Sequence, residues 1–579
     1  MSAHPMSAHP MSAHPEPQSA APPAAAGARS PWVILAVLCT SVFIIVVDGT
    51  IVNVALPTLV RELGATTSQL QWIVDAYVLV FAGLLMAAGS LGDRYGRKGV
   101  LQIGLALFAA TSIAASMADS AGALIAWRAA MGIGGALIFP ATLALLVNVF
   151  TVARQRAIAI AVWAATSGLA VALGPVSGGL LLKYFSWGSV FLVNVPVIAI
   201  AMGLVAWLVP TSRDTTVHRM DPVGIVLSVL GISLLVWAVI EGPKHGWLSV
   251  TSLVAFLGAA ALLAIFVRFE RRSDHPMLDV TVFGNLRFTA GSVAVCFAFF
   301  ALFGFIFNVT QYFQVVRGYG TLEAGVRTVP FALFTGAAAP LAAALAQRLG
   351  TKYVVAAGLT SMAVGFAWTT TLSDGSSYWL IVGQMLCMGG GLGLVNAPAT
   401  EAIMGSLPPE KAGVGSAVND TARELGGTMG VAIVGSLFAS VYSGKLDDLL
   451  GGTALPAPAL AIAKQSVGAG AEVARQAAVQ SGPEVGALVQ RAVNTAFLDG
   501  FHLGSWVSAA ITLIGAGMAL RWLPSRAADR DNSAVVEVTP VAQGSNDASG
   551  GGIGFEDDRL AACGTGSAGV GELAQPVER

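Results

Sequence analysis

The sequence contains few charged residues. Only 11% of its 579 residues are Asp, Glu, Lys or Arg, whereas 55% are hydrophobic and the mean hydropathy is +0.73. A soluble globular protein carries about 25% charged residues, so a chain of this length could not cover its surface with polar groups in water. The scarcity of charge therefore excludes a soluble globular protein and indicates that lipid surrounds much of the chain. The net charge of −1 also disfavours a nucleic-acid partner, which would select a basic surface.

Cysteine is scarce and the common catalytic signatures are missing. Of the four cysteines, Cys39, Cys296 and Cys387 lie in apolar runs, and no pair has the spacing of metal ligands. No Gly-x-x-x-x-Gly-Lys-Ser/Thr segment occurs, which disfavours ATP as an energy source. His-Glu-x-x-His and Gly-x-Ser-x-Gly are absent too, so hydrolysis is unsupported. We expect no metal, no cofactor and no enzymatic activity.

Long apolar runs fill the space between two polar tails. Each run must form a helix, because an isolated strand cannot satisfy its backbone groups in lipid. The predicted spans number about fourteen and lie near 32–54, 71–91, 99–117, 122–147, 157–182, 190–209, 222–240, 250–267, 288–313, 324–346, 353–371, 378–403, 412–440 and 501–522. The fold class is therefore an all-α integral membrane protein.

The spacing of these runs predicts two six-helix bundles on either side of two extra central helices. The predicted segments are a disordered tail with three Met-Ser-Ala-His-Pro repeats (1–31), the first bundle (32–210), the two additional helices (211–287), the second bundle (288–523) and a disordered tail (524–579). Inside the second bundle we predict a long external loop at about 441–500. Its Ala, Val and Gln content has helical periodicity and indicates an external helical hairpin or cap.

The distribution of Lys and Arg predicts the orientation. Basic residues are concentrated in alternate connections, such as Arg94 to Lys98 and Arg268 to Arg272. Because cytoplasmic loops carry the excess of positive charge, both termini are expected in the cytoplasm. The abundance of Ala, Gly and Val indicates a bacterial source with GC-rich DNA, and hence a multi-pass protein of the bacterial plasma membrane.

A glycine-rich charged loop joins the second and third predicted spans. Its glycines permit a tight turn between helices, and its charges can pair with helix ends and with each other. Such pairs could stabilise one gating state. Alternatively, the loop could serve solely to set the topology of the chain. The residues concerned are Gly89, Gly92, Asp93, Arg94, Gly96, Arg97 and Lys98.

Three charged residues lie inside predicted spans of the first bundle: Asp48, Asp75 and Arg128. A charge at the bilayer centre costs about 2.5–3.5 kcal/mol on insertion scales, so it usually faces a protein cavity. Removal from water makes a carboxylate easier to protonate, so Asp48 is a candidate proton-coupling site. A structural ion pair or hydrogen-bonded anchor is the alternative, and Asp75 is a candidate cavity residue.

The second bundle holds a further charged cluster. Asp420 and Glu424 are four residues apart and share a helix face, with Arg423 beside them. They could form a proton site, a cation-binding pocket or an internally neutralised structural cluster. Further candidate substrate or cavity residues are Arg327, Asn396 and Glu401.

The fifth predicted span contains Gly174, Pro175, Gly178 and Gly179. Proline removes a backbone hydrogen bond and bends a helix, while glycines allow close helix contact. The bend could seal the outward path and enforce exchange, or it could serve packing alone.

Together these segments resemble the major facilitator superfamily, and within it the fourteen-span drug:proton antiporters. The resemblance is carried by the charged loop from Gly89 to Leu101, by Asp48 to Pro57, by Arg128 to Ala136, by Gly174 to Gly179 and by Asn419 to Gly427. It covers roughly 32–525. Two departures occur: Val47 precedes Asp48 where leucine is usual, and Ser186-Trp187-Gly188 replaces Trp-Arg-Trp, although Asn194 and Pro196 of that motif remain.

The resemblance implies export of lipophilic drugs or antibiotics by proton antiport with alternating access. It also implies that Asp48 couples transport to protons, that Arg128 assists proton release, and that the protein works as a monomer. The expected partners are a small-molecule substrate, protons and the lipid membrane. Two alternatives stay open: a dedicated exporter of one endogenous metabolite or antibiotic, and a membrane sensor that transports nothing.

Overall fold

The computed structural model describes residues 30–523, with gaps at 212–220, 274–275, 277, 279, 408–411 and 454. The chain divides into two units, Met1–Ala528 and Asp529–Arg579. The second unit lies outside the described residues, as do nearly all of the tails predicted at 1–31 and 524–579. Everything below concerns the first unit.

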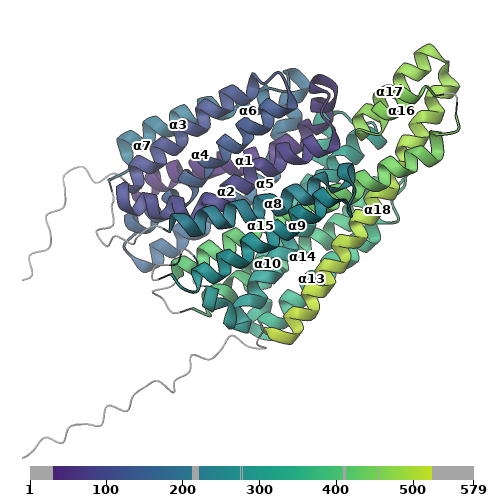
Figure 1. The fold of residues 1–579 in the computed structure, drawn as a ribbon. Helices are drawn as coiled ribbons and strands as arrows, with labels where there is room; N and C mark the ends of the chain where they lie inside the picture. Colours follow the sequence, from purple (N-terminus) through teal and green to yellow (C-terminus); the bar gives the residue numbers. More distant parts are fainter. Residues whose placement is uncertain are drawn as a thin grey trace, which may run out of the picture. The chain divides into compact units, whose positions relative to one another are not determined.

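The regular elements of the described residues are all helical (Figure 1). The first seven are α1 (Pro31–Leu63), α2 (Thr67–Tyr95), α3 (Arg97–Ser116), α4 (Ala121–Val149), α5 (Ala153–Tyr184), α6 (Ser189–Leu192) and α7 (Asn194–Leu208). Two central helices follow, α8 (Pro222–His245) and α9 (Val250–Glu270). The remainder are the 3-10 helix η1 (Val280–Gly284), α10 (Leu286–Gln311), the π-helix η2 (Tyr312–Val316), α11 (Thr321–Arg327), α12 (Val329–Leu349), α13 (Thr351–Thr369), α14 (Tyr378–Met404), α15 (Ala412–Leu450), α16 (Ala457–Ala463), α17 (Val467–Gln480) and α18 (Pro483–Trp522).

The predicted all-α membrane fold is confirmed. Among the described residues, twelve helical segments are long and apolar enough to cross a membrane, and α5 makes thirteen when its two bent parts are counted as one span. The remaining predicted span, 353–371, coincides with α13, which is not one of these thirteen. The predicted bend is present in α5: its parts Ile158–Val171 and Leu173–Tyr184 meet at 41°, because Pro175 cannot donate to the carbonyl of Val171.

The charged loop between the second and third spans is a one-residue turn. α2 ends and α3 begins at Gly96, whose φ of 105° belongs to a region that side-chain-bearing residues rarely adopt. The predicted tight turn therefore depends on this glycine.

Two separate hydrophobic cores lie in the two halves of the bundle. The first core is built mainly from α1–α7 and the second mainly from α10–α18. Helix α8 packs against both α2 and α15 through a smaller cluster that contains Leu79, Val236, Ile240 and Ala432, and α9 packs against α8. Figure 1 shows α8 running beside α2 and α15.

The segment 441–500, predicted as a long loop with a helical hairpin or cap, is mostly helical. Helix α15 continues to Leu450 and α18 already begins at Pro483, so these helices extend about ten and eighteen residues beyond the predicted span ends at 440 and 501. Between them, α16 and α17 form a hairpin that packs against α18 (Figure 1). Tyr442 anchors this α16–α17 hairpin by donating a hydrogen bond to the carbonyl of Ala463 over 3.1 Å.

Helices α10 and α15 approach closely where α15 has glycine. Gly426 and Gly430, four residues apart, face the backbone of α10 at Cys296 and Phe300. Small residues at this spacing let the backbones of membrane helices touch.

We expect Gly430→Val to lower the stability of the bundle. The added side chain would meet the Phe300 backbone, and overpacking of a filled interface costs about 1–3 kcal/mol. Thermal unfolding in detergent measures the effect. The matched control is Gly517→Val on α18, where nothing lies within 4 Å of an added Cβ; equal melting temperatures for the two variants would contradict the packing argument.

Candidate functional site

The first charged site is an ion pair at the centre of the first half. Asp48 on α1 and Arg128 on α4 are both fully buried, and their side chains form an ion pair. The second carboxylate oxygen of Asp48 accepts a hydrogen bond from Asn194 Nδ2 on α7 over 2.8 Å. Arg128 also donates from Nε to the carbonyl of Ile73 on α2 over 3.0 Å. The structure thus brings together two of the predicted proton-coupling residues and adds Asn194 from a third helix.

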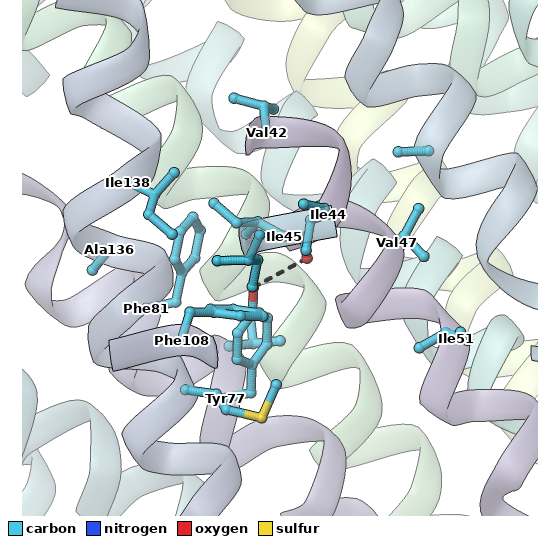
Figure 2. Packing of buried hydrophobic residues seen from close by; sticks show 14 of the residues in the cluster. Val42, Ile44, Ile45, Val47, Ile51, Tyr77, Phe81, Phe108, Ala136 and Ile138 are labelled. Carbon is cyan, nitrogen blue, oxygen red and sulfur yellow. Dashed lines mark hydrogen bonds between the residues drawn. The ribbon is translucent and has the colours of Figure 1, made fainter. Parts of the chain in front are cut away.

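Tyr77 on α2 completes this site. Its ring lies under the Arg128 guanidinium, 4.3 Å from centroid to Cζ, and its hydroxyl donates to the carbonyl of Ile45 over 3.1 Å. Figure 2 shows Tyr77 beside Ile45, Phe81 and Phe108 within the apolar packing of this half. The sequence analysis did not single out Tyr77, because an aromatic residue in an apolar run has no distinguishing signal.

A break in the helix after the fifth span places Asn194. The short helix α6 ends at Leu192, and α7 starts at Asn194. Asn194 therefore stands at the first position of α7 and is only 3% exposed. A polar residue just before Pro196 in an apolar run was the available sequence signal, and it was noted only as part of a family motif.

A second polar cluster joins α14 and α15 in the other half. Arg423 donates to Asn396 Oδ1 over 2.8 Å and to Thr400 Oγ1 over 3.3 Å. Thr400 in turn donates to Asn419, which donates to Asp420 over 3.4 Å. The structure thus brings Asp420, Arg423 and Asn396 together and adds Thr400 and Asn419.

The members of this cluster differ from the first site in exposure. Asp420, Arg423 and Glu424 are half-buried, and the Arg423 guanidinium lies 5.5 Å from the centre of the Phe299 ring. Glu424 lies one helical turn beyond Asp420. Glu401 is exposed and is not among the hydrogen-bonding groups of the cluster. The half-buried acids with adjacent aromatic rings can contact a lipophilic cation.

Asp75 lies where the two halves meet. It is fully buried, and within the described residues neither of its carboxylate oxygens has a hydrogen-bond partner. Gln71, one turn away on the same face of α2, donates to the carbonyls of Val431 and Ala432 on α15 over 3.2 and 3.0 Å. Asp75 therefore occupies the α2 face that contacts α15.

Arg327 occupies a different environment from the other candidate cavity residues. It ends α11, pairs with Glu323 over 2.6 Å, and stacks between the rings of Tyr319 and Tyr378 at 4.1 and 4.4 Å. None of these partners belongs to the Asn396–Arg423 cluster. The charge of Arg327 is thus neutralised locally.

The glycines of α5 make contacts with both halves. Gly174 and Gly178 lie against Thr50 and Ile51 of α1, where a Cβ at Gly178 would come 2.8 Å from Ile51 Cγ1. Gly179 and Pro175 lie against α11. The backbone of α11 can approach the carbonyl of Pro175 because the residue of α11 that faces it, Gly325, has no side chain. Sequence analysis missed Gly325, which carries no charge and belongs to no recognised motif.

Hydrogen bonds between described residues of the two halves share one chemistry, which we call the neutral seal. Uncharged groups, nearly all of them side-chain amides and hydroxyls, donate across the interface, mostly to backbone carbonyls. Written from donor to acceptor, these hydrogen bonds are Thr67 to Gln465 (2.9 Å), Gln71 to Val431 and Ala432, Thr310 to Asn53 (3.1 Å), Gln314 to Val54 (2.9 Å) and Thr321 to Gly179 (3.2 Å). All lie toward the end of the bundle where α1 finishes and α2 begins.

The charged loop lies at the opposite end, where α2 meets α3. Lys98 donates from Nζ to the carbonyl of Ala206 near the end of α7 over 2.8 Å, as expected for a cation at a helix C-terminus. Arg94 is exposed and stacks on Tyr95 at 5.5 Å, and Arg97 is half-buried. The side chain of Asp93 lies outside the described residues. The contact of Lys98 stays within the first half.

Comparison with known proteins identifies the family. Residues 38–431 match the profile of the Major Facilitator Superfamily. The chain belongs to this superfamily. It is 39% identical to the multidrug efflux pump LfrA of Mycolicibacterium smegmatis, over 76% of this chain and 87% of that protein. It is 32% identical to the tetracenomycin C resistance and export protein of Streptomyces glaucescens, over 86% of this chain and 93% of that protein.

The solved structures agree on the fold. A bacterial homologue of the human lysosomal transporter Spinster, in an inward-facing and unoccupied conformation, superposes with a TM-score of 0.58 at 16% identity. The match covers 86% of this chain and 98% of that one. The predicted family is therefore confirmed, and the protein is a multi-pass transporter with bacterial relatives rather than an enzyme.

We expect Asp48→Ala to be more destabilising than the double variant Asp48→Ala/Arg128→Leu. Breaking a buried pair leaves an uncompensated charge and costs about 3–5 kcal/mol, whereas replacing both partners by apolar groups can be nearly neutral. Unfolding in detergent measures both. As a control, Asp447→Ala removes the more exposed partner of Lys464 and should cost no more than about 1 kcal/mol. A double variant as unstable as the single one would argue against a coupled pair.

We expect Gly325→Val to weaken the neutral seal by forcing α11 away from Pro175. Spin labels at the exposed positions Tyr184 and Gly320 report the separation of α5 and α11. The variant should add a population with a longer distance, since overpacking of about 1–3 kcal/mol is enough to shift a two-state equilibrium. Gly336→Val on α12, with nothing within 4 Å of an added Cβ, is the control. Unchanged distances in both variants would rule out Gly325 as part of the seal.

Proposed function

We propose that this protein exports lipophilic drugs or antibiotics, often cationic, in exchange for protons. The observation that carries the proposal is the fully buried Asp48, which is held by the permanent cation Arg128 and by Asn194. A carboxylate is the only partner in this set that can bind and release a proton in the physiological pH range. The similarity to a multidrug efflux pump supports the choice of substrate class.

In the proposed cycle, protonation of Asp48 removes one charge of the ion pair. The attraction between α1 and α4 then weakens, because the neutral acid no longer attracts Arg128 as an ion. One facing state is favoured by the protonated protein and the other by bound substrate, as alternating access requires. Asp420 and Glu424 are the candidate second proton carriers.

The substrate is proposed to bind beside the half-buried cluster of the second half. Asp420 and Glu424 offer negative charge, Phe299 offers a ring, and Asn396 and Arg423 fix the geometry of the site. Asp75 lies at the interface that must part for the other facing state. These groups suit a flat, lipophilic cation.

We also propose the topology and assembly of the protein. Both termini lie in the cytoplasm of a bacterium, so the neutral seal and the α16–α17 hairpin face outward and the charged loop faces inward. With the seal formed, the described state is closed to the outside. The protein functions as a monomer in the plasma membrane.

A dedicated exporter of a single metabolite is the second candidate. It is favoured by the 32% identity to an antibiotic export protein, because the match covers 93% of that relative. A screen of chemically different toxic compounds in a pump-deficient host, with and without an uncoupler, separates the two candidates by the number of compounds exported. A sensor that transports nothing would show no counterflow in proteoliposomes.

We expect Asp48→Asn to abolish uncoupler-sensitive ethidium export from cells, because the amide keeps the shape of the carboxyl group but cannot take up a proton. Ethidium efflux is followed by fluorescence. Glu62→Gln, at the exposed end of the same helix, is the matched control and should retain wild-type export. Full coupled export by Asp48→Asn would remove Asp48 from the scheme.

A further inference from the structure

Asn194 uses its side chain in a way that is unusual for a helix start. Asparagine near a helix N-terminus commonly accepts a hydrogen bond from a backbone N–H of the first turn. Asn194, at the first position of α7, instead donates from Nδ2 to Asp48 Oδ1 on α1 over 2.8 Å, at 3% exposure. The two oxygens of Asp48 are thus divided between two helices: Oδ2 belongs to Arg128 of α4 and Oδ1 to Asn194 of α7.

We propose that Asn194 is a positioning residue that holds the Asp48 side chain in both of its protonation states. The inference rests on the proposed function, in which Asp48 exchanges the transported proton. An amide carries donors and an acceptor, so it can donate to the carboxylate and, after rotating, accept from the carboxylic acid. Arginine has five donors and no acceptor, so Arg128 can donate to either form of Asp48 but cannot accept a hydrogen bond from the acid's O–H.

Arg128 has its own anchors for the state in which Asp48 is neutral. Its Nε donates to the carbonyl of Ile73, and its guanidinium lies over the rings of Tyr77 and Phe191 at 4.3 and 5.9 Å. Arg128 therefore stays attached to α2 when the acid is protonated. Protonation therefore removes the ionic part of the attachment of α1 to α4, while the hydrogen bond to Asn194 of α7 can be kept.

No other described charge competes for Asp48. The titratable groups that face it are Arg128 from α4 and the Tyr77 phenol from α2, with Glu424 of α15 near enough to act on Tyr77 electrostatically. The acids and bases of α11 and α17, which also pack on α1, form pairs of their own: Glu323 with Arg327 and Glu472 with Arg475. Asn194 is thus the remaining polar partner that can hydrogen-bond to Asp48 both before and after protonation.

The test separates two activities of the purified protein in liposomes, with radiolabelled ethidium as the probe. Exchange of ethidium for ethidium at equal pH on both sides does not require Asp48 to change its protonation state. Accumulation driven by a pH gradient requires it in every cycle. Asn194→Leu has nearly the same size as asparagine but neither donates nor accepts.

We expect Asn194→Leu to lower gradient-driven accumulation at least about tenfold, equivalent to roughly 1.4 kcal/mol, while exchange stays within about twofold of wild type. Asn308→Leu is the matched control, because Asn308 is fully buried on α10 and donates to Gly304 of its own helix. It should keep the wild-type ratio of the two activities. If Asn194→Leu leaves both activities intact, or lowers them in parallel, the proposal is overturned.

Asn194→Ser and Asn194→Ala provide a second comparison that does not depend on the leucine variant folding. They differ by one hydroxyl group, which can both donate and accept. Gradient-driven accumulation should be higher in the serine variant at equal exchange, and equal values would overturn the proposal. If the wild type itself shows no gradient-driven accumulation, the proposed function fails; if it does and the variants behave alike, only the role of Asn194 fails.

Discussion

The arrangement of the first half depends on keeping one carboxylate and one guanidinium together away from water. An isolated charge in the membrane interior is costly, so Asp48 and Arg128 must remain paired or one of them must change its charge state. That requirement fixes the relative positions of α1 and α4. It also explains the other polar groups nearby, since the backbone carbonyl of Ile73, the ring of Tyr77 and the amide of Asn194 all satisfy a charge that solvent cannot reach.

The second half handles charge differently. Arg423 is held by the neutral groups of Asn396 and Thr400, while Asp420 and Glu424 are half-buried. Charge in this half is therefore partly open to solvent or to a bound molecule. One half thus contains a closed titratable site and the other an accessible polar surface, a division that suits a protein that must recognise two unlike ligands, a proton and an organic molecule.

The sequence predicted the features that arise from a residue that is energetically unfavourable inside an apolar helix. Asp48 and Arg128 were found because charge inside an apolar run demands a partner, and the bend in α5 because Pro175 must break a hydrogen bond. It failed where the decisive feature was a contact between distant segments. The Asn194–Asp48 bond depends on the break between α6 and α7, and the contact of Gly325 with Pro175 joins α11 to the distant helix α5. The continuation of α15 beyond 440 and the start of α18 before 501 were not predicted, because alanine-rich helix outside an apolar run resembles a loop in hydropathy.

The chemistry of the neutral seal has a consequence for how the two halves separate. Thr310, Gln314 and Thr321 close the interface with amide and hydroxyl groups, and no ion pair between described side chains joins the halves. Parting these groups separates no pair of opposite charges, so the interface can open and close without rearranging ion pairs. Its opening should therefore depend little on ionic strength, because screening acts on charges and not on amide or hydroxyl hydrogen bonds.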